Sequence, residues 1–205
     1  MQGEVLSFDE KGQVECRARF VDGVLHGMTE RYDDAQRLVQ SIPYCRGLIE
    51  GVMTVYVEGA LLSRIEYVGG LREGQFMSYS PSGAVSSEVA YVAGKAHGPA
   101  CYYFPEGERA RTVNHVAGLL DGEACDYGLD GTLLARTYYR LGKKNGVATQ
   151  YHANGKVREE ANFVDGVPDG EVRKYDKDGA LLDADNKPVK KPKRKMAWLD
   201  KWIEG

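Results

Sequence analysis

The chain lacks several features that would point to a membrane-spanning, metal-binding or catalytic protein. It has no run of about 18 apolar residues, which excludes a transmembrane helix. Its four cysteines show none of the short spacings of metal-binding motifs. Its four histidines are scattered, and every glycine belongs to a repeating pattern rather than to a phosphate-binding loop. We therefore expect no enzyme, no cofactor and no metal site.

Disulfide bonds are not expected either. Cys101 and Cys125 share a register in the repeat described below, which places them two strands apart, at roughly 9–10 Å. A disulfide needs Cα atoms within ~7 Å of each other. We predict that these two cysteines, together with Cys16 and Cys45, are free thiols.

Glycine and tyrosine are abundant, with 25 and 13 residues, and both recur with a period of 24. One aromatic register, with a single spacing of 23, contains Phe8, Tyr32, Tyr56, Tyr79, Tyr103, Tyr127, Tyr151 and Tyr175. A second register with the same slip contains Phe20, Tyr44, Tyr67, Tyr91, His115, Tyr139 and Phe163. Each unit closes with two glycines four residues apart, from Gly23/Gly27 to Gly166/Gly170. A fixed period of this length is typical of a repeat array, whose units share a core and present a long surface.

Each unit has the pattern of two strands and two turns. A short strand ends at the first aromatic, and a polar turn with glycine follows. A longer strand then ends at the second aromatic, before the glycine pair. Glycine supplies the positive φ that a tight hairpin turn needs, at Gly12 for example. Gln36 replaces this glycine in the second unit, so we expect a different turn there.

The longer strands alternate between apolar or small residues and polar ones, which predicts a sheet packed on one face and wet on the other. The predicted fold is all-β: an elongated single-sheet antiparallel solenoid of about seven and a half 24-residue β-hairpin repeats over residues 1–182. An aromatic stripe should run along one face. Pro43, inside a predicted strand, indicates an irregular or edge position.

Tandem units of this form resemble MORN repeats. Residues 91–98 (YVAGKAHG) and 163–170 (FVDGVPDG) carry the aromatic-x-x-G-x-x-x-G signature, and the resemblance covers roughly residues 3–182. The unit length and residues 155–160 (GKVREE) look more like the bacterial variant repeat, whose members are often regarded as antitoxin components. The resemblance implies a non-catalytic antitoxin or immunity protein that sterically masks a cognate toxin or effector. MORN arrays also serve as membrane-associated scaffolds, and this is the alternative.

Residues that break the period are the better candidates for function. In the fifth unit the longer strand carries Arg109, Arg111 and His115, where neighbouring units have aliphatic, small or aromatic residues. Three groups able to carry positive charge favour a site for an anion or an acidic partner, since arginine offers forked donors to carboxylates and phosphates. The alternative is an internal pairing with another row of the same face or with Glu108, Asp121 or Glu123.

The tyrosines of the stripe, Tyr91 and Tyr139 among them, are the second candidate for partner contact, because protein interfaces favour tyrosine and arginine. The alternative is a stripe buried by sheet curvature and by the C-terminal tail. Glu159 and Arg173 also break the pattern, and we expect them to form a cross-strand ion pair.

The composition changes after residue 182. Residues 183–195 form a basic linker with prolines, and residues 196–205 contain both tryptophans, Trp198 and Trp202. The tryptophans lie four residues apart, so they would share one apolar edge of a short amphipathic C-terminal helix. This helix has three alternative roles: a cap on the open sheet edge, an insert into a partner's groove, or, through residues 187–203, contact with an anionic membrane.

Charge and the start of the sequence complete the expectations. Residues 1–182 contain 26 acidic and 20 basic residues, and this acidic body would repel a nucleic acid. The first residues include no basic or apolar stretch, which predicts a cytoplasmic protein. Because Gly3 already lies in a repeat register, a trimmed N-terminus would look the same, and the periplasm is the alternative location. The sequence does not define the oligomeric state.

Overall fold

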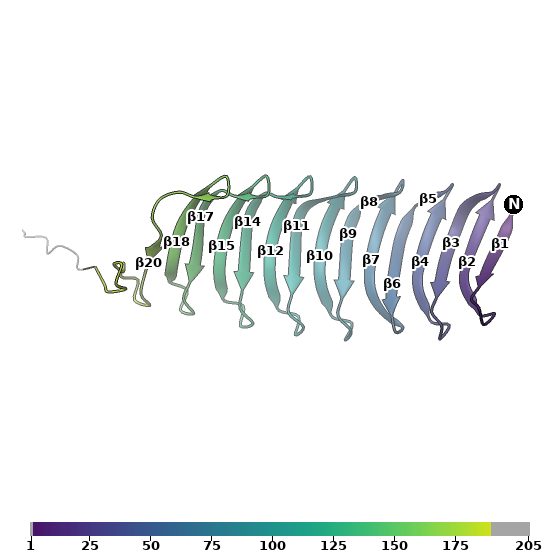
Figure 1. The fold of residues 1–205 in the computed structure, drawn as a ribbon, viewed down its shortest axis with the longest axis horizontal. Coiled ribbons are helices and arrows are strands. Elements are labelled where there is room, and N and C mark those ends of the chain that lie inside the picture. Colours follow the sequence, from purple (N-terminus) through teal and green to yellow (C-terminus); the bar gives the residue numbers. More distant parts are fainter. Residues whose placement is uncertain (1, 190–205) are drawn as a thin grey trace, which may run out of the picture.

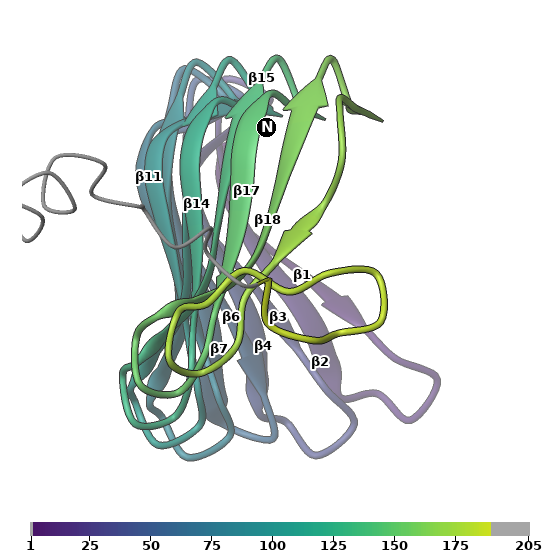
Figure 2. The ribbon, with the colours of Figure 1, turned by 90° about the vertical axis from the view of Figure 1, so that its left-hand side faces the viewer.

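The described part of the chain is one long, twisted antiparallel sheet. The structure is a computed structural model that describes residues 2–189. Twenty strands belong to a single sheet, and successive hairpins stand side by side along its long axis (Figure 1). Viewed along that axis, the N-terminal strands are rotated against the C-terminal ones, as the twist between neighbouring strands requires (Figure 2). The all-β, single-sheet prediction is confirmed, and the sheet does not close.

The strands form three sets that recur along the array. The longer strands, which end one residue past the second aromatic, are β2 (Val14–Val21), β4 (Leu38–Cys45), β7 (Ala60–Val68), β10 (Val85–Val92), β12 (Arg109–Val116), β15 (Leu133–Arg140) and β18 (Val157–Val164). The strands that end at or next to the first aromatic are β1 (Gly3–Phe8), β3 (Val24–Tyr32), β6 (Gly51–Val57), β9 (Gly74–Tyr79), β11 (Lys95–Tyr103), β14 (Gly122–Tyr127), β17 (Gly146–Tyr151) and β20 (Arg173–Lys174). The two-residue strands between the glycines of a pair are β5 (Leu48–Ile49), β8 (Leu71–Arg72), β13 (Leu119–Leu120), β16 (Lys143–Lys144) and β19 (Val167–Pro168).

The turn at the first glycine of each pair is a two-residue turn. Asp22 has φ 52° and Gly23 has φ 82°, the two positive values of a type I′ hairpin. These turns are also tied to one another: the Gly47 N–H donates to the Leu25 carbonyl of the preceding unit at 2.9 Å. The same bond recurs at Gly70, Gly94, Gly118, Gly142 and Gly166. Along one long side of the array, the turns of successive units are therefore connected by a ladder of backbone hydrogen bonds.

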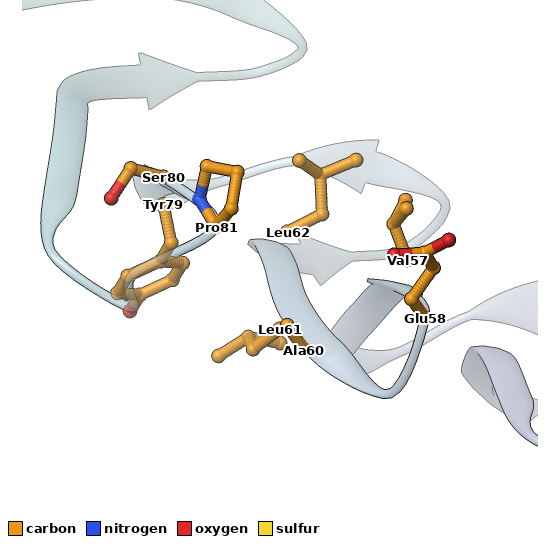
Figure 3. A pocket seen from close by; sticks show the side chains of 8 residues that line it. All are labelled: Val57, Glu58, Ala60, Leu61, Leu62, Tyr79, Ser80 and Pro81. Atoms are coloured by element: carbon orange, nitrogen blue, oxygen red, sulfur yellow. The ribbon is translucent and has the colours of Figure 1, made fainter.

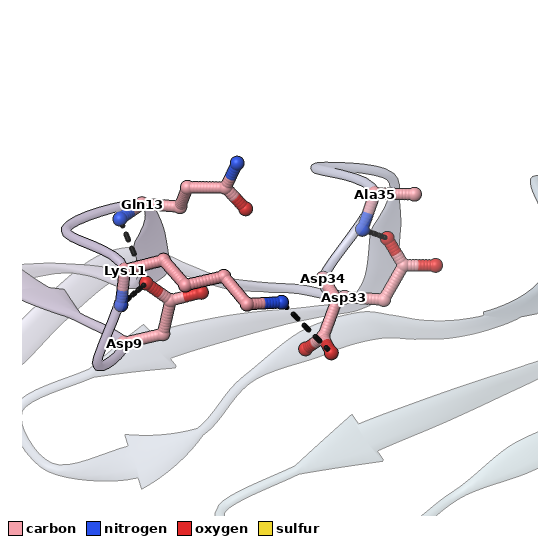
Figure 4. Close-up of polar contacts among 6 residues, drawn as sticks. All are labelled: Asp9, Lys11, Gln13, Asp33, Asp34 and Ala35. Atoms are coloured by element: carbon pink, nitrogen blue, oxygen red, sulfur yellow. Dashed lines mark hydrogen bonds and ion pairs between the residues drawn. The ribbon is translucent and has the colours of Figure 1, made fainter.

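At the opposite edge, an aspartate at the start of several turns caps the backbone of the turn. The Asp9 carboxylate accepts from the N–H groups of Lys11 and Gln13 at 2.9 and 2.8 Å (Figure 4). Asp33 accepts from Ala35 in the same way at 3.0 Å. Such local side-chain bonds satisfy backbone donors that the sheet does not reach.

Gln36 stands in for the turn glycine and leaves the turn unchanged. Its φ of 57° is left-handed, and its N–H donates to the Asp33 carbonyl at 2.8 Å, as Gly12 does to Asp9 at 3.0 Å. Its Nε2 donates to the Val14 carbonyl of the preceding hairpin at 3.0 Å. The expectation of a different turn is wrong, because this added hydrogen bond offsets the strain of a left-handed residue.

The single spacing of 23 residues arises at one turn. Between β6 and β7 the chain reverses at Glu58 and Gly59, with φ 52° and 84°, so a two-residue turn replaces the longer turn found in other units on that edge. The strands on both sides keep their pairing. The missing residue therefore shortens one turn and leaves the strand pairing of the sheet intact.

Alternation divides the side chains between two faces. On one, here called the aromatic face, the second aromatics form a row, each opposite a glycine, as Tyr139 is opposite Gly122. The first aromatics lie on the opposite face. The Tyr32 hydroxyl, for example, donates at 2.8 Å to Glu30, two residues earlier on the same strand. Aromatic residues thus line both faces.

The core is thin, since no described segment covers either face of the sheet. On the aromatic face a central row of side chains, between 1% and 8% exposed, forms the buried cluster of Val89, Ala100, Val113 and Ala124. Tyr91 and Tyr139 are partly buried and pack against it. The two tyrosines therefore stabilise the sheet and still present part of their surface.

The cysteines are free, as predicted. Cys101 and Cys125 flank Thr112 from both sides, two strands apart, and none of the four cysteines forms a disulfide within residues 2–189.

Pro43 lies in β4 opposite the break between β5 and β6, an irregularity that most units share. The predicted C-terminal helix, residues 196–205, lies outside the described residues.

Candidate binding groove

Arg111, on β12, is paired within the sheet. Its Nη1 lies 3.4 Å from Oδ1 of Asp126 on β14, and the two side chains are 42% and 45% exposed. An ion pair this exposed contributes little to stability. The internal pairing considered from the sequence is thus present, with a partner on the same face other than the three carboxylates suggested.

The predicted positive trio of Arg109, Arg111 and His115 does not form one cluster. A bulge pairs Tyr102 with Arg111 and Tyr103 with Arg109, which interrupts the alternation between the two arginines. Arg109 is exposed at the turn end of β12. The bulge therefore separates Arg109 from the row that contains Arg111.

His115 occupies the aromatic row as a packing residue. It is opposite Gly98, partly buried, and its burial lowers the pKa of the imidazole. Its Nδ1 is buried with no hydrogen-bond partner among the described residues. The lowered pKa favours the neutral ring, so His115 is a weak candidate for a third cation.

Two cations that sequence analysis missed lie within the aromatic row. The Arg72 guanidinium carbon is 5.4 Å from the Tyr91 ring centroid, and the Lys144 Nζ is 5.0 Å from that of Phe163. Both distances are in the range of a cation–π contact. At this register the other units have Leu25, Ile49, Ala96, Leu120 and Pro168. Both cations break the period, but they lie in the segment between the two glycines and not in a longer strand.

A groove of about 320 Å³ lies on the aromatic face of the C-terminal units, between β12 and β18. Its floor consists of small residues: Ala124, Ala135, Thr137, Ala148 and Ala161. One wall comes from the aromatic row: Tyr139, Lys144 and Phe163. The other wall is polar: Arg111, Asp126, Gln150 and Glu159. We call this hollow the C-terminal groove.

The size of the floor residues explains why the groove lies in these units. Ala148 shares a register with Met53 and Phe76 of earlier units, which carry larger side chains at this position, and it is opposite another alanine, Ala161. Ala124, in the same register, is 3% exposed and belongs to the buried cluster. The central pairing is the same in the two regions, since Met53 is opposite Ile65 and Phe76 opposite Val89, as Ala148 is opposite Ala161; only the turn between β6 and β7 is shorter. The groove thus coincides with smaller side chains on strands that keep the same central pairing.

The charges around the groove balance. Arg111 and Lys144 line the groove together with Asp126 and Glu159, two residues of each sign. The side-chain oxygen of Gln150 accepts a hydrogen bond from Arg158, which leaves its NH₂ group as a donor. The groove is therefore polar, close to neutral overall and equipped with hydrogen-bond donors.

The expected ion pair between Glu159 and Arg173 is wrong. Glu159 is opposite Gln150 and Lys174, whereas Arg173 is opposite Glu160, with Nη1 to Oε2 at 4.0 Å. A shift of one residue in the pairing moves a side chain to the other face of the sheet. Glu159 belongs to the groove, and Arg173 belongs to the opposite face.

A polar cluster lies on that opposite face, behind the groove. Glu123 accepts from the Cys125 thiol at 3.1 Å and from the Tyr138 hydroxyl at 3.0 Å, and lies 3.5 Å from the Arg136 Nε. These hydrogen bonds lower the pKa of Glu123, and burial raises the pKa of the Cys125 thiol. Cys125 is thus held as an unreactive thiol.

A second hollow, of about 340 Å³, lies beside the shortened turn between β6 and β7. Its lining is mostly apolar and includes Val57, Leu61, Leu62, Tyr79 and Pro81 (Figure 3). No residue predicted from the sequence to bind a partner lies there. We therefore regard the C-terminal groove, which contains Arg111 and Tyr139, as the candidate site.

Three further points concern the tryptophans, metal binding and membrane-spanning helices. Trp198 and Trp202 lie outside the described residues. Within residues 2–189, no three His, Cys, Asp or Glu side chains gather in a way that could hold a metal ion. Over the same residues there is no helix with the length and apolar character needed to cross a membrane.

Comparison with protein families gives one match. Residues 144–165 match the family description of the MORN repeat variant. The chain contains a MORN variant repeat. The matched segment covers the hairpin of β17 and β18 and supplies Lys144, Ala148 and Phe163 to the groove. The other units share its turns and strand pairing, so the resemblance to MORN repeats is confirmed. No curated protein matches the sequence.

Two solved structures of TarM are distantly similar to the chain. One is a crystal structure of a mutant of S. aureus TarM in complex with fondaparinux, α-GlcNAc-glycerol and UDP, at 12% identity and a TM-score of 0.26, covering 64% of this chain and 21% of that one. Another crystal structure of TarM has 13% identity and a TM-score of 0.25, with 53% and 19% covered. The chain thus spans about a fifth of the TarM chains. Scores this low support no conclusion on fold or activity.

Proposed function

We propose that this MORN-repeat chain is a non-catalytic protein that binds a cognate protein through the C-terminal groove. More specifically, we propose a bacterial antitoxin or immunity protein that masks a toxin. The supporting observation is the truncation of the groove floor to alanine and threonine, which opens a site against the stabilising pattern of the array. Binding sites are commonly found where a protein departs from the rules that stabilise its fold.

The residues around the groove suit protein recognition. Arg111 and Tyr139 belong to the residue types that dominate binding energy at interfaces, and Lys144 over Phe163 adds an aromatic contact with a cation. Masking needs no chemical step, because a bound ribbon sterically blocks the surface that it covers. A long array with units tied edge to edge provides a rigid surface for this purpose.

The proposal is tested by capture followed by a toxicity assay. The tagged chain is used to isolate partners from cells that naturally produce it, and the partner is identified and expressed alone and together with the chain. We expect growth arrest by the partner alone and recovery on co-expression. A partner that is harmless alone would contradict the antitoxin proposal.

A matched pair of variants locates the contact. Ala148→Phe fills the groove with the residue that Phe76 provides at the same register, so the fold should accept it. Met53→Phe places the same side chain at the same register outside the groove, where a large side chain is already present. Loss of capture and rescue with Ala148→Phe alone would support the groove, whereas equal behaviour of both variants would contradict it.

A membrane-associated scaffold is the second candidate function. It is favoured by six lysines and arginines between residues 187 and 195, followed by both tryptophans, the composition of a segment attracted to anionic lipid. Sedimentation with anionic liposomes, with and without residues 183–205, tests it. Equally low binding of both forms would rule this candidate out.

A further inference from the structure

We propose that the C-terminal groove accommodates a segment of the partner in the polyproline II conformation, with a proline or other compact side chain at every third residue. This inference rests on the proposed binding function and names the conformation of the ligand. It is carried by the spacing of the groove's aromatic residues, by its alanine floor and by its hydrogen-bond donors.

The spacing selects among peptide conformations. Tyr139 on β15 and Phe163 on β18 occupy the same register one unit apart, and one strand lies between them. Two strand spacings amount to about 9.5 Å. A polyproline II helix repeats every three residues with a rise of about 3.1 Å each, which gives a period of about 9.3 Å. Its equivalent side chains therefore meet successive aromatic residues of the array.

Other regular conformations do not match this period. An extended strand repeats its side chains every two residues, or roughly 6.7 Å, and an α-helix has a pitch of about 5.4 Å. Only over longer distances would such ligands come back into register with the aromatics. The groove reaches from Arg111 on β12 to Glu159 on β18, five strands, or about 19 Å between the outer two. This length accommodates about six residues of a polyproline II helix.

The groove also supplies what such a ligand needs. Proline lacks a backbone N–H, so a proline-rich segment offers mainly carbonyl acceptors. Arg111, Lys144 and the NH₂ group of Gln150 are donors along the groove, and Lys144 forms no ion pair within residues 2–189. The alanines of the floor allow the ligand to approach the sheet closely. The balance of charges removes any demand for a charged ligand.

The energetic argument favours the same ligand. A polyproline II segment is already ordered in solution, so it loses little conformational entropy on binding. Proline rings also pack against aromatic side chains, which is how other aromatic-lined grooves recognise such segments. A flexible segment of equal length would lose more entropy in the same groove and bind more weakly.

The test measures binding of a fluorescein-labelled decaproline by fluorescence anisotropy, with a labelled Gly-Ser decapeptide as the flexible control. We expect saturable binding of decaproline and at least tenfold weaker binding of the control. Ala148→Phe should raise the Kd for decaproline at least tenfold, and Met53→Phe by less than twofold. Tyr139→Leu should weaken binding more than Tyr67→Leu, its match outside the groove. Circular dichroism verifies that each variant is folded.

The outcomes separate this inference from the proposed function. No saturable binding of decaproline, equal binding of the Gly-Ser peptide, or equal effects of Ala148→Phe and Met53→Phe would overturn the inference. If decaproline fails while Ala148→Phe still abolishes capture of the natural partner, the groove binds a protein in another conformation and the proposed function stands. If Ala148→Phe leaves capture intact, the groove itself is not the site.

Discussion

The middle and the C-terminal units of the array share one backbone but differ in what lies on it. In the middle, large side chains such as Met53 and Phe76 fill the central rows of the aromatic face. In the C-terminal units Ala148 and Ala161 are opposite each other in these rows, and a groove results. The central strand pairing is alike in both regions, and the turns differ only at Glu58 and Gly59. A repeat array can thus form a site by removing atoms in a few units, while the rest of the sheet provides the stability.

The largest expected effect is a difference in unfolding free energy between a charge placed in the buried cluster and one placed in the groove. Val113→Asp places a carboxylate at a side chain only 6% exposed, and should lower the free energy of unfolding by about 4 kcal/mol. Thr137→Asp, on the neighbouring longer strand and in the groove, should cost about 1 kcal/mol because water reaches it. Urea denaturation of both variants measures the difference. Equal losses would mean that the groove floor is as dry as the core.

A smaller effect on stability is expected when the large residue of a middle unit and the alanine of the groove floor are exchanged at the same register. Phe76→Ala removes a partly buried ring that packs on the central cluster, and should cost about 2 kcal/mol. Ala148→Phe should change stability by no more than about 1 kcal/mol, since the groove has room for the ring. Thermal unfolding followed by circular dichroism compares them. If Ala148→Phe proves as destabilising as Phe76→Ala, the groove is closed in solution.

The two cations of the aromatic row should differ in function and not in stability. Arg72→Leu and Lys144→Leu each restore the aliphatic residue of neighbouring units, and each should alter stability by less than about 0.5 kcal/mol. Only Lys144→Leu should weaken partner capture, because only Lys144 lines the groove. Capture assays with both variants, at matched concentration, check this expectation. Equal weakening would extend the site to the middle units.

The smallest expected effect is the pH dependence caused by His115. Its pKa is lower in the folded chain than in the unfolded one, so the unfolded state binds the proton more readily. The stability contributed by the neutral ring is present above the unfolded pKa and is lost as the pH falls through the folded pKa. His115→Phe introduces the residue that Phe163 provides at the same register, and should therefore reduce the loss of stability on acidification through this range. Urea denaturation at a series of pH values measures the change, and an unchanged pH profile would show that His115 is not the titrating group.

The fold was largely predictable because every unit repeats the same local signals. Glycine positions and the period of two determined the turns, the strands and the single sheet. The turn at Gln36 was mispredicted because a side-chain hydrogen bond to the preceding hairpin is not visible in local sequence. Arg109 was placed with Arg111 because alternation cannot foresee a bulge.

The groove was less predictable than the fold, although two of the residues that line it, Arg111 and Tyr139, were among the predicted partner-binding residues. Its floor combines residues of two strand types, such as Ala148 on a shorter strand and Ala161 on a longer one, whose adjacency depends on cross-strand register. Breaks in the period stand out mainly in the longer strands, where the alternation is clear. Lys144 lies in the segment between two glycines, where no face could be assigned without the structure.

The shortened turn at Glu58 and Gly59 has a consequence for how such a molecule can change over evolutionary time. The chain loses a residue there and the sheet continues without a fault. An array with this tolerance can gain or lose residues at its turns, or whole hairpins, while its cross-section stays constant. Length is therefore an inheritable variable that can change without altering the cross-section, and a surface of this kind can be fitted to partners of different size by duplication or deletion of single units.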